Sequence, residues 1–223
     1  IIVDMNTLKI EIVSDVVCPW CVIGFKNLRK AINELENELS FKISWKPYEL
    51  HPEIPENGYD KELYMQQKFG SSRGNEIYDE IVNIGKDLDF DFNFSKTKRI
   101  PNTFLAHRLL WYAEQKNVQN ELSEALFYAY FTDGKDVGSV EVLAKIASDV
   151  GLDESEIKTF LESNIGTKEV ENQKIDAIER SIGAVPTYVI NDQYLIQGGQ
   201  QPETFMSFLR RIQLKEQEKQ DAK

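Results

Sequence analysis

The sequence predicts an α/β protein in which a strand–helix–strand unit is followed by a long helical segment and then by two strands and a helix. Strand-like runs occur near both ends of the chain, and apolar residues recur with a helical period through the middle. Turns that contain glycine or proline separate these segments. The chain has 223 residues, of which 41% are hydrophobic and 28% are charged. This length and composition are typical of a soluble protein with a sizeable core, built as one elaborated domain or two.

The first unit occupies about residues 8–50. Residues 8–13 and 41–47 have the composition of strands, and the segment between them has a helical period. Pro19 suits the first position of that helix, because the missing N–H of proline needs no partner there. The apolar positions of the helix return to one face at steps of three and four residues: Val22, Phe25, Leu28, Ile32, Leu35 and Leu39. This order of elements predicts a parallel βαβ unit.

The remainder of the chain is helical in pattern until strands return near its end. Residues 60–178 are almost wholly helical in pattern. Residues 186–190 and 194–197 predict a β-hairpin, and Pro202 opens a terminal helix. Short turns interrupt the helical segment at about residues 70–74, 100–102, 132–134 and 150–151.

These segments predict three regions. Residues 5–59 and 179–215 form one discontinuous domain, and residues 60–178 form a helical insertion between its two halves. Residues 216–223 are charged and are expected to be a flexible tail. Residues 1–4 precede Met5 and are interpreted as an expression remnant or the mark of an earlier cleavage.

The acidic charge of the chain limits its partners. The formal net charge is −11, and the sequence contains no cluster of basic residues. Both features disfavour binding to nucleic acid or anionic lipid. No apolar run approaches the ~18 residues that span a bilayer, and the N-terminus lacks a secretory signal pattern. We expect a cytoplasmic protein with no nucleic-acid or membrane partner. The sequence leaves a monomer and a homodimer open.

The chain has two cysteines, Cys18 and Cys21, which follow the first predicted strand. A Cys-x-x-Cys pair beside a βαβ pattern is typical of reversible disulfide chemistry. Cys18 is expected at the N-terminus of the first helix, where unpaired N–H groups and the helix dipole favour the thiolate. Cys21 lies nearly one turn further on and is expected to be the more buried thiol. It would resolve a mixed disulfide formed by Cys18.

Two structural interpretations of the cysteine pair compete with this one. A permanent disulfide would close a very short loop, for which the chain-entropy model gives little stabilisation. A closed zinc site requires four ligands, whereas the chain adds only His51 and His107 to the two cysteines. We therefore predict a redox pair and no metal site.

Four segments carry a resemblance to a known family: residues 14–21 (SDVVCPWC), 102–109 (NTFLAHRL), 183–187 (GAVPT) and 197–200 (QGGQ). Together they resemble the DsbA-like thioredoxin superfamily, and the FrnE-like branch within it. The resemblance spans nearly the whole chain. It implies a thioredoxin-like fold with a large all-helical insertion. It also implies a thiol–disulfide oxidoreductase that acts on disulfide- or thiol-bearing proteins or small thiols, with Cys18 as nucleophile and Cys21 as resolving thiol.

The resemblance also implies roles away from the cysteines. Pro186 matches the family's cis-proline, whose loop packs against the cysteine pair and offers backbone groups of Val185 to an extended peptide. Thr187, Asn102 and His107 are expected to contribute to substrate binding. Asn102 also suits the N-cap of a helix that begins at residue 103. For His107, a hydrogen-bonded packing role is the competing interpretation.

Pro19 and Trp20 lie between the cysteines and are expected to support the pair. In the best-known oxidant of the superfamily, a histidine holds the place of Trp20. The tryptophan removes a polar and potentially cationic neighbour of the Cys18 thiolate. We therefore expect a less oxidising pair in this protein.

Two other functions remain open. Glutathione-dependent isomerases and transferases of the same superfamily, such as 2-hydroxychromene-2-carboxylate isomerase and kappa-class enzymes, have a serine in place of Cys18 and bind glutathione at the cis-proline loop. A non-catalytic peptide-binding chaperone is the third hypothesis. The leading function requires no metal or organic cofactor, because the sulfur pair itself is redox-active. Glutathione enters only as a co-substrate.

Overall fold

The structure is a computed structural model that describes residues 7–69 and 74–221. The predicted remnant at residues 1–4, together with Met5, lies outside the described residues. So does most of the predicted turn at residues 70–74.

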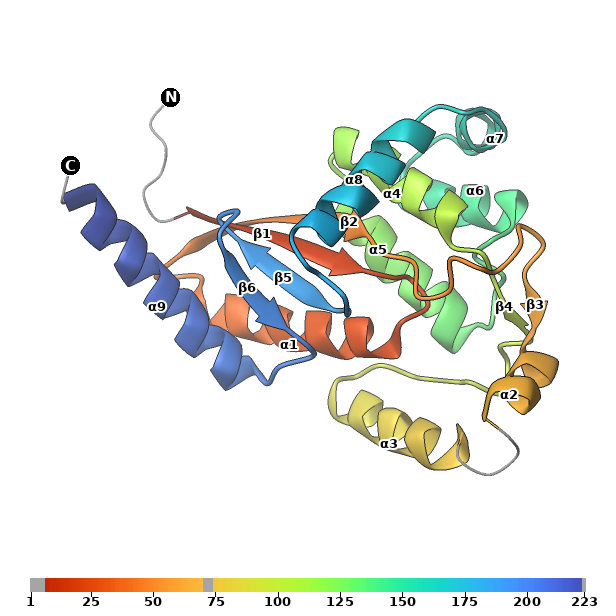
Figure 1. Ribbon diagram of the computed structural model, residues 1–223, viewed down its shortest axis with the longest axis horizontal. Helices are drawn as coiled ribbons and strands as arrows, with labels where there is room; N and C mark the ends of the chain where they lie inside the picture. The colour runs from red at the N-terminus through yellow and green to blue at the C-terminus, as the bar shows by residue number, and fades with distance from the viewer. Residues whose placement is uncertain (1–6, 70–73, 222–223) are drawn as a thin grey trace.

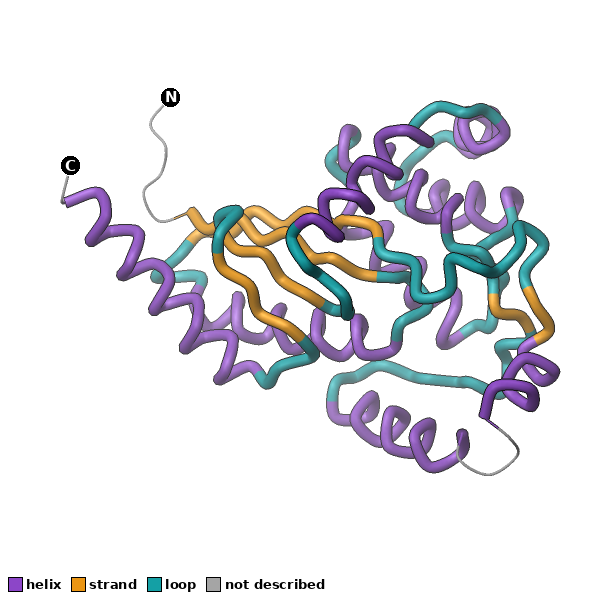
Figure 2. The backbone as a smooth tube through the Cα atoms, in the orientation of Figure 1, coloured by secondary structure: helices purple, strands orange, loops and turns teal. Residues whose placement is uncertain are grey.

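A four-stranded mixed sheet is formed by the two ends of the chain (Figure 2). Its strands are β1 (Thr7–Ser14), β2 (Ser40–Pro47), β5 (Thr187–Ile190) and β6 (Tyr194–Gln197), in the order β2-β1-β5-β6. β1 and β2 are parallel, whereas β5 is antiparallel to both β1 and β6. The predicted βαβ unit and C-terminal hairpin are both confirmed, and the fold is the α/β thioredoxin-like fold with a helical insertion.

One face of the sheet is covered by α1 (Pro19–Leu35) and α9 (Pro202–Asp221), which pack against each other (Figure 1). Alternation along the strands puts Ile12 and Tyr188 on this face, where they are opposite each other in the β1–β5 register. Apolar side chains of α1 complete this part of the core, with Phe25 1% exposed.

The opposite face of the sheet is covered by α8 (Thr167–Glu179). Val13 and Val189 alternate onto this face and are buried with Ala177 of α8 and Ile182, which follows that helix. Because the two faces bury different side chains, a shift of one residue in the β1–β5 register would move side chains of each set to the wrong face of the sheet.

Between β2 and β5 the chain is mainly helical. Its described helices are α2 (Lys61–Phe69), α3 (Gly74–Asp87), α4 (Phe104–Gln115), α5 (Gln119–Phe127), the π-helical turn η1 (Tyr128–Thr132), α6 (Val140–Asp149), α7 (Glu154–Glu162) and α8. A small antiparallel sheet of β3 (Tyr59–Asp60) and β4 (Arg99–Ile100) interrupts them. The sequence did not predict these two strands, because two residues are too few to show an alternating pattern.

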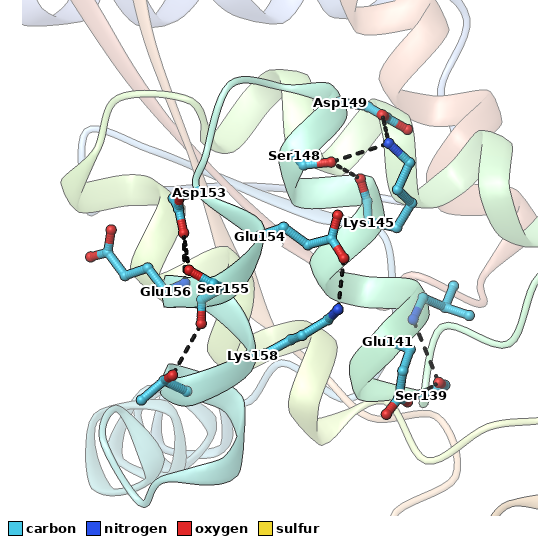
Figure 3. Close-up of polar contacts among 12 residues, drawn as sticks. Ser139, Glu141, Lys145, Ser148, Asp149, Asp153, Glu154, Ser155, Glu156 and Lys158 are labelled. Atoms are coloured by element: carbon cyan, nitrogen blue, oxygen red, sulfur yellow. Dashed lines mark hydrogen bonds and ion pairs between the residues drawn. The ribbon is translucent and has the colours of Figure 1, made fainter.

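The helices of the insertion are capped by local polar contacts, which Figure 3 shows for α6 and α7. The Ser139 side chain accepts a hydrogen bond from the N–H of Val142, and the Asp153 side chain accepts one from the N–H of Glu156. Lys158 pairs with Glu154 one turn earlier on the exposed side of α7. N-caps of this type satisfy donors that the first turn of a helix leaves free.

The insertion and the sheet share one apolar core. Trp45 of β2 packs its indole edgewise against Phe25 of α1, at 4.7 Å between ring centroids, and against Phe127 of α5, at 5.8 Å. The amide of Gln119 adds a polar tie, because it exchanges hydrogen bonds with the backbone of Trp45. The boundaries at residues 60 and 178 remain predictions of where one structural unit ends and the other begins.

The predicted flexible tail requires a correction. Residues 216–221 continue α9 rather than leaving it. The carboxylate of Glu216 accepts hydrogen bonds from the Tyr194 hydroxyl and from Lys219, which holds this part of the helix to β6. A charged composition alone did not reveal this contact between segments distant in the sequence.

Candidate active site

Cys18 lies at the N-cap of α1, and Pro19 is the first residue of the helix, as the sequence predicted. The backbone reaches this position through a turn in which the Cys18 N–H donates to the carbonyl oxygen of Asp15 at 3.1 Å. The Cys21 N–H then donates to the carbonyl oxygen of Cys18, also at 3.1 Å. Cys18 therefore faces the positive end of the helix dipole, which stabilises an anionic sulfur.

Both cysteines are free thiols and both are buried. Cys21 is fully inaccessible, whereas Cys18 retains 4% exposure and Trp20 beside it is 38% exposed. Burial and then the hydrogen bond and charge of Cys18 raise the pKa of Cys21 well above its ordinary value, against smaller opposing effects of the Ser14 side chain and the Asp15 backbone. A thiol that keeps its proton in this way suits the resolving position rather than the attacking one.

The loop before β5 lies directly against the cysteines. The Val185–Pro186 peptide bond is cis. The Cys18 thiol donates to the carbonyl oxygen of Val185, with 3.9 Å between sulfur and oxygen. Thr187 is fully buried, and its hydroxyl donates to the carbonyl of Ala184 at 2.7 Å, so its side chain braces the loop. The structure thus brings Val185 and Pro186 to the cysteine pair.

Two glycines that the sequence analysis left without a role allow this loop to approach α1. A Cβ atom on Gly24 would lie 3.1 Å from Cγ of Pro186 and 3.0 Å from Cα of Gly199. A Cβ atom on Gly199 would lie 3.3 Å from the carbonyl oxygen of Trp20. The QGGQ segment therefore packs its backbone on the first turns of α1, and Asn27 fixes it by donating to the carbonyl of Gln200 at 2.9 Å.

A buried carboxylate anchors the turn that precedes the cysteines. Oδ2 of Asp15 accepts a hydrogen bond from the N–H of Leu50 at 2.7 Å. Its Oδ1 lies 3.5 Å from Nε2 of His107, which itself donates to the carbonyl oxygen of Tyr48 at 2.9 Å. Asp15 and His107 are 1% and 3% exposed, so both side chains lie inside the protein. His107 here ties α4 to the segment after β2, and its role in substrate binding remains a prediction.

Asn102 lies just before the start of α4. Its amide donates to the carbonyl oxygen of Ile54 at 2.7 Å and accepts from the N–H of Phe104 at 2.9 Å, while the N-cap of α4 is Thr103. The helix therefore begins one residue later than the sequence predicted. Asn102 lines a cavity of about 500 Å³ between the insertion and the segment that carries Glu49 and Glu56, to which neither cysteine contributes. Its role in substrate binding remains a prediction.

Arg108, which is part of the NTFLAHRL segment, is a buried structural residue. Its guanidinium donates to carbonyl oxygens at and beyond the C-terminus of α7, including those of Ser163 at 2.6 Å and Ile165 at 2.7 Å. It also bonds the carbonyls of Phe160 and Leu161. Burial lowers the pKa of Arg108 from its ordinary value, and the ring of Phe160 lies 5.2 Å from the guanidinium carbon.

Among residues 7–69 and 74–221, no group of three or more histidine, cysteine or acidic side chains is arranged to hold a metal ion. Within the same residues, no helix is both long enough and apolar enough to cross a membrane.

Residues 9–210 match the DSBA-like thioredoxin domain family. The chain belongs to this family. The uncharacterized protein YwbO of Bacillus subtilis (strain 168) is 30% identical to it over 193 residues, which are 83% of this chain and 88% of YwbO.

Two solved structures share the DsbA-like fold of the chain. A "probable DsbA oxidoreductase" from Streptomyces coelicolor superposes with a TM-score of 0.84 at 24% identity, covering 92% of this chain and 89% of that one. A 2-hydroxychromene-2-carboxylate isomerase superposes with a TM-score of 0.69 at 16% identity, covering 92% of this chain and 95% of that one. At these identities the likeness establishes the fold alone.

Proposed function

We propose that this DsbA-like protein is a thiol–disulfide oxidoreductase in which Cys18 is the nucleophile and Cys21 the resolving thiol. The observation that carries the proposal is the position of Cys18 at the N-terminus of α1, against the Val185 carbonyl, with Cys21 buried behind it. A helix N-terminus stabilises the attacking thiolate, and burial keeps the second thiol protonated until it is needed.

The proposed reaction transfers two electrons in two exchange steps. The Cys18 thiolate attacks one sulfur of a substrate disulfide, forms a mixed disulfide and releases the other substrate sulfur as a thiolate. Cys21 then loses its proton to solvent and attacks the Cys18 sulfur. This step forms the Cys18–Cys21 disulfide and releases the second substrate thiolate. The substrate is reduced and the protein is oxidised, and the reverse sequence oxidises a substrate dithiol.

The loop around Pro186 is the proposed substrate-positioning element. The Val185 carbonyl already interacts with the Cys18 thiol, so a substrate that displaces this contact enters beside the reacting sulfur. The exposed face of Trp20 borders the same site. These features favour a substrate that contacts the backbone of the Pro186 loop and the ring of Trp20. An extended protein segment or a small disulfide can make both contacts.

The proposed chemistry uses no resident metal or organic cofactor, because the two sulfurs carry the electrons. An external thiol pool, such as glutathione or a small redox protein, must return the pair to its starting state. A reducing compartment such as the cytoplasm fits this cycle, since reduced thiols are plentiful there.

Trapping of a mixed disulfide tests the proposal. Purified Cys21→Ser protein, incubated with an oxidised substrate protein or with glutathione disulfide, should accumulate a covalent adduct at Cys18 that dithiothreitol releases. The matched Cys18→Ser protein should form no such adduct. Adducts on neither variant would contradict the proposed nucleophile.

A glutathione-dependent isomerase is the second candidate, and the shared fold with 2-hydroxychromene-2-carboxylate isomerase favours it. The presence of Cys18 weighs against it, since that chemistry does not need a thiol at this position. The same Cys18→Ser protein separates the two candidates. Disulfide exchange should be lost in this variant, whereas a glutathione-dependent isomerase activity should persist.

A further inference from the structure

Tyr188 is a buried polar residue that the reaction outlined above does not use. It lies in β5, two residues after Pro186, and the side chains of both residues lie beside Gly24 of α1. It is fully inaccessible, and its ring packs edgewise on Phe205 of α9 at 4.9 Å between centroids. Leucine or phenylalanine would serve such an apolar position without the hydroxyl.

The hydroxyl of Tyr188 has no hydrogen-bond partner in the part of the chain that the structure describes. A buried donor without a partner costs free energy, so its presence calls for a physical reason. The hydroxyl occupies the space left by Gly24, whose missing Cβ would lie 2.3 Å from the phenolic oxygen. Gly24 is one helical turn after Cys21, so these two residues share one face of α1.

The hydroxyl of Tyr188 and the two cysteines interact through their charges. Burial raises the pKa of Tyr188 well above its ordinary value, and the charges of Cys21 and then Cys18 raise it further. The phenol therefore remains a neutral O–H donor. In the dithiol form described here it bonds to neither sulfur, which is consistent with the weak acceptor strength of a protonated thiol.

We propose that Tyr188 is a catalytic residue, whose hydroxyl donates a hydrogen bond to the Cys21 sulfur when Cys21 attacks the mixed disulfide. This inference rests on the proposed function. In that step Cys21 gives up its proton and its sulfur becomes an anion, which accepts hydrogen bonds more strongly than a thiol does. In a water-excluded site, a fixed donor of this kind stabilises developing charge.

The two exchange steps can be measured separately with an aromatic disulfide such as 5,5′-dithiobis(2-nitrobenzoate). Attack by Cys18 releases the first coloured thiolate, and attack by Cys21 on the mixed disulfide releases the second. In a stopped-flow experiment with the dithiol protein, Tyr188→Phe should slow the second phase about fivefold, the effect of one lost hydrogen bond. It should change the first phase by less than about twofold, because Cys18 lies at the N-terminus of α1 and is stabilised there.

Tyr194→Phe is the matched control, because Tyr194 lies in β6 of the same hairpin. Its hydroxyl donates a hydrogen bond to Glu216 and not to a group of the cysteine site. It should leave both phases unchanged. Equal slowing of both phases by Tyr188→Phe, or no slowing of the second, would overturn the proposal, since a purely structural hydroxyl acts on neither step selectively. Failure of the wild-type protein to release the second thiolate would instead contradict the proposed function itself.

Discussion

The Cys18 thiol and the Val185 carbonyl oxygen lie 3.9 Å apart, although 167 residues separate them in the chain. This contact joins the start of α1 to the loop before β5, and it depends on the antiparallel pairing of β1 with β5. The site is therefore a property of the assembled sheet rather than of the Cys-x-x-Cys segment alone. Several substitutions test how the surrounding residues maintain it.

Gly24→Ala should destabilise the protein by about 2 kcal/mol, because the added methyl group meets the Tyr188 hydroxyl, Pro186 and the backbone of Gly199. Urea unfolding followed by circular dichroism measures this loss. Gly183→Ala is the control, since a Cβ there meets nothing within 4 Å. Equal stability of the two variants would show that the loops around Pro186 and Gly199 do not pack closely on α1 at Gly24.

Asp15→Ala should cost about 2 kcal/mol of unfolding free energy, because it removes the buried carboxylate that accepts the hydrogen bond of the Leu50 N–H. Asp15→Asn retains an acceptor oxygen for Leu50 and should cost less. Both values come from chemical denaturation of the dithiol form. If the alanine variant is as stable as the asparagine variant, the Leu50 hydrogen bond does not anchor the turn before Cys18.

Arg108→Lys should destabilise the protein by about 2 kcal/mol despite the retained charge. The guanidinium bonds four carbonyl oxygens, of Phe160, Leu161, Ser163 and Ile165, and an ammonium group cannot reproduce its planar fork. Thermal and urea unfolding measure the effect. Arg29→Lys, at an exposed ion pair, should change stability by less than about 0.5 kcal/mol. A similar small change for Arg108→Lys would contradict the capping role.

The stability of the dithiol form should fall in alkaline solution because of Cys21. Its pKa in the folded protein is raised well above the ordinary value of 9.0, so the folded state holds this proton more tightly than the unfolded state does. The resulting stability is fully present below pH ~9 and is lost as the pH rises towards the folded pKa. The unfolding free energy of the dithiol protein should therefore decrease more between about pH 8 and about pH 10 than that of Cys21→Ser. Parallel curves for the two proteins would contradict the raised pKa.

Local patterns in the sequence predicted the elements that frame the site. The alternation of residues 8–13, the proline at the start of α1 and the hairpin at residues 186–197 all depend on neighbouring residues, and the structure confirms them. The two-residue strands β3 and β4 and the extension of α9 were missed, because they depend on contacts between distant segments.

In the site too, local sequence patterns were predictable and contacts between distant segments were not. Cys18 and Cys21 are recognisable from their spacing, whereas the roles of Gly24 and Tyr188 appear only when β5 is packed on α1. The signals present were a glycine inside a predicted helix and a tyrosine inside a predicted strand, and neither identifies its partner. His107 and Arg108 were noted within one segment, but their hydrogen bonds to Tyr48 and Ser163 could not be read from it.

Equilibration of the protein against glutathione redox buffers tests the central claim most directly, with the Cys18–Cys21 disulfide quantified by mass spectrometry and Trp20 fluorescence followed in parallel. A thiol–disulfide oxidoreductase should show a single reversible two-electron transition to an internal disulfide. Its potential should lie nearer that of thioredoxin, about −270 mV, than that of DsbA, about −120 mV. A stable glutathione adduct on Cys18 with no internal disulfide at any buffer ratio would contradict the proposed disulfide exchange and favour the glutathione-dependent isomerase.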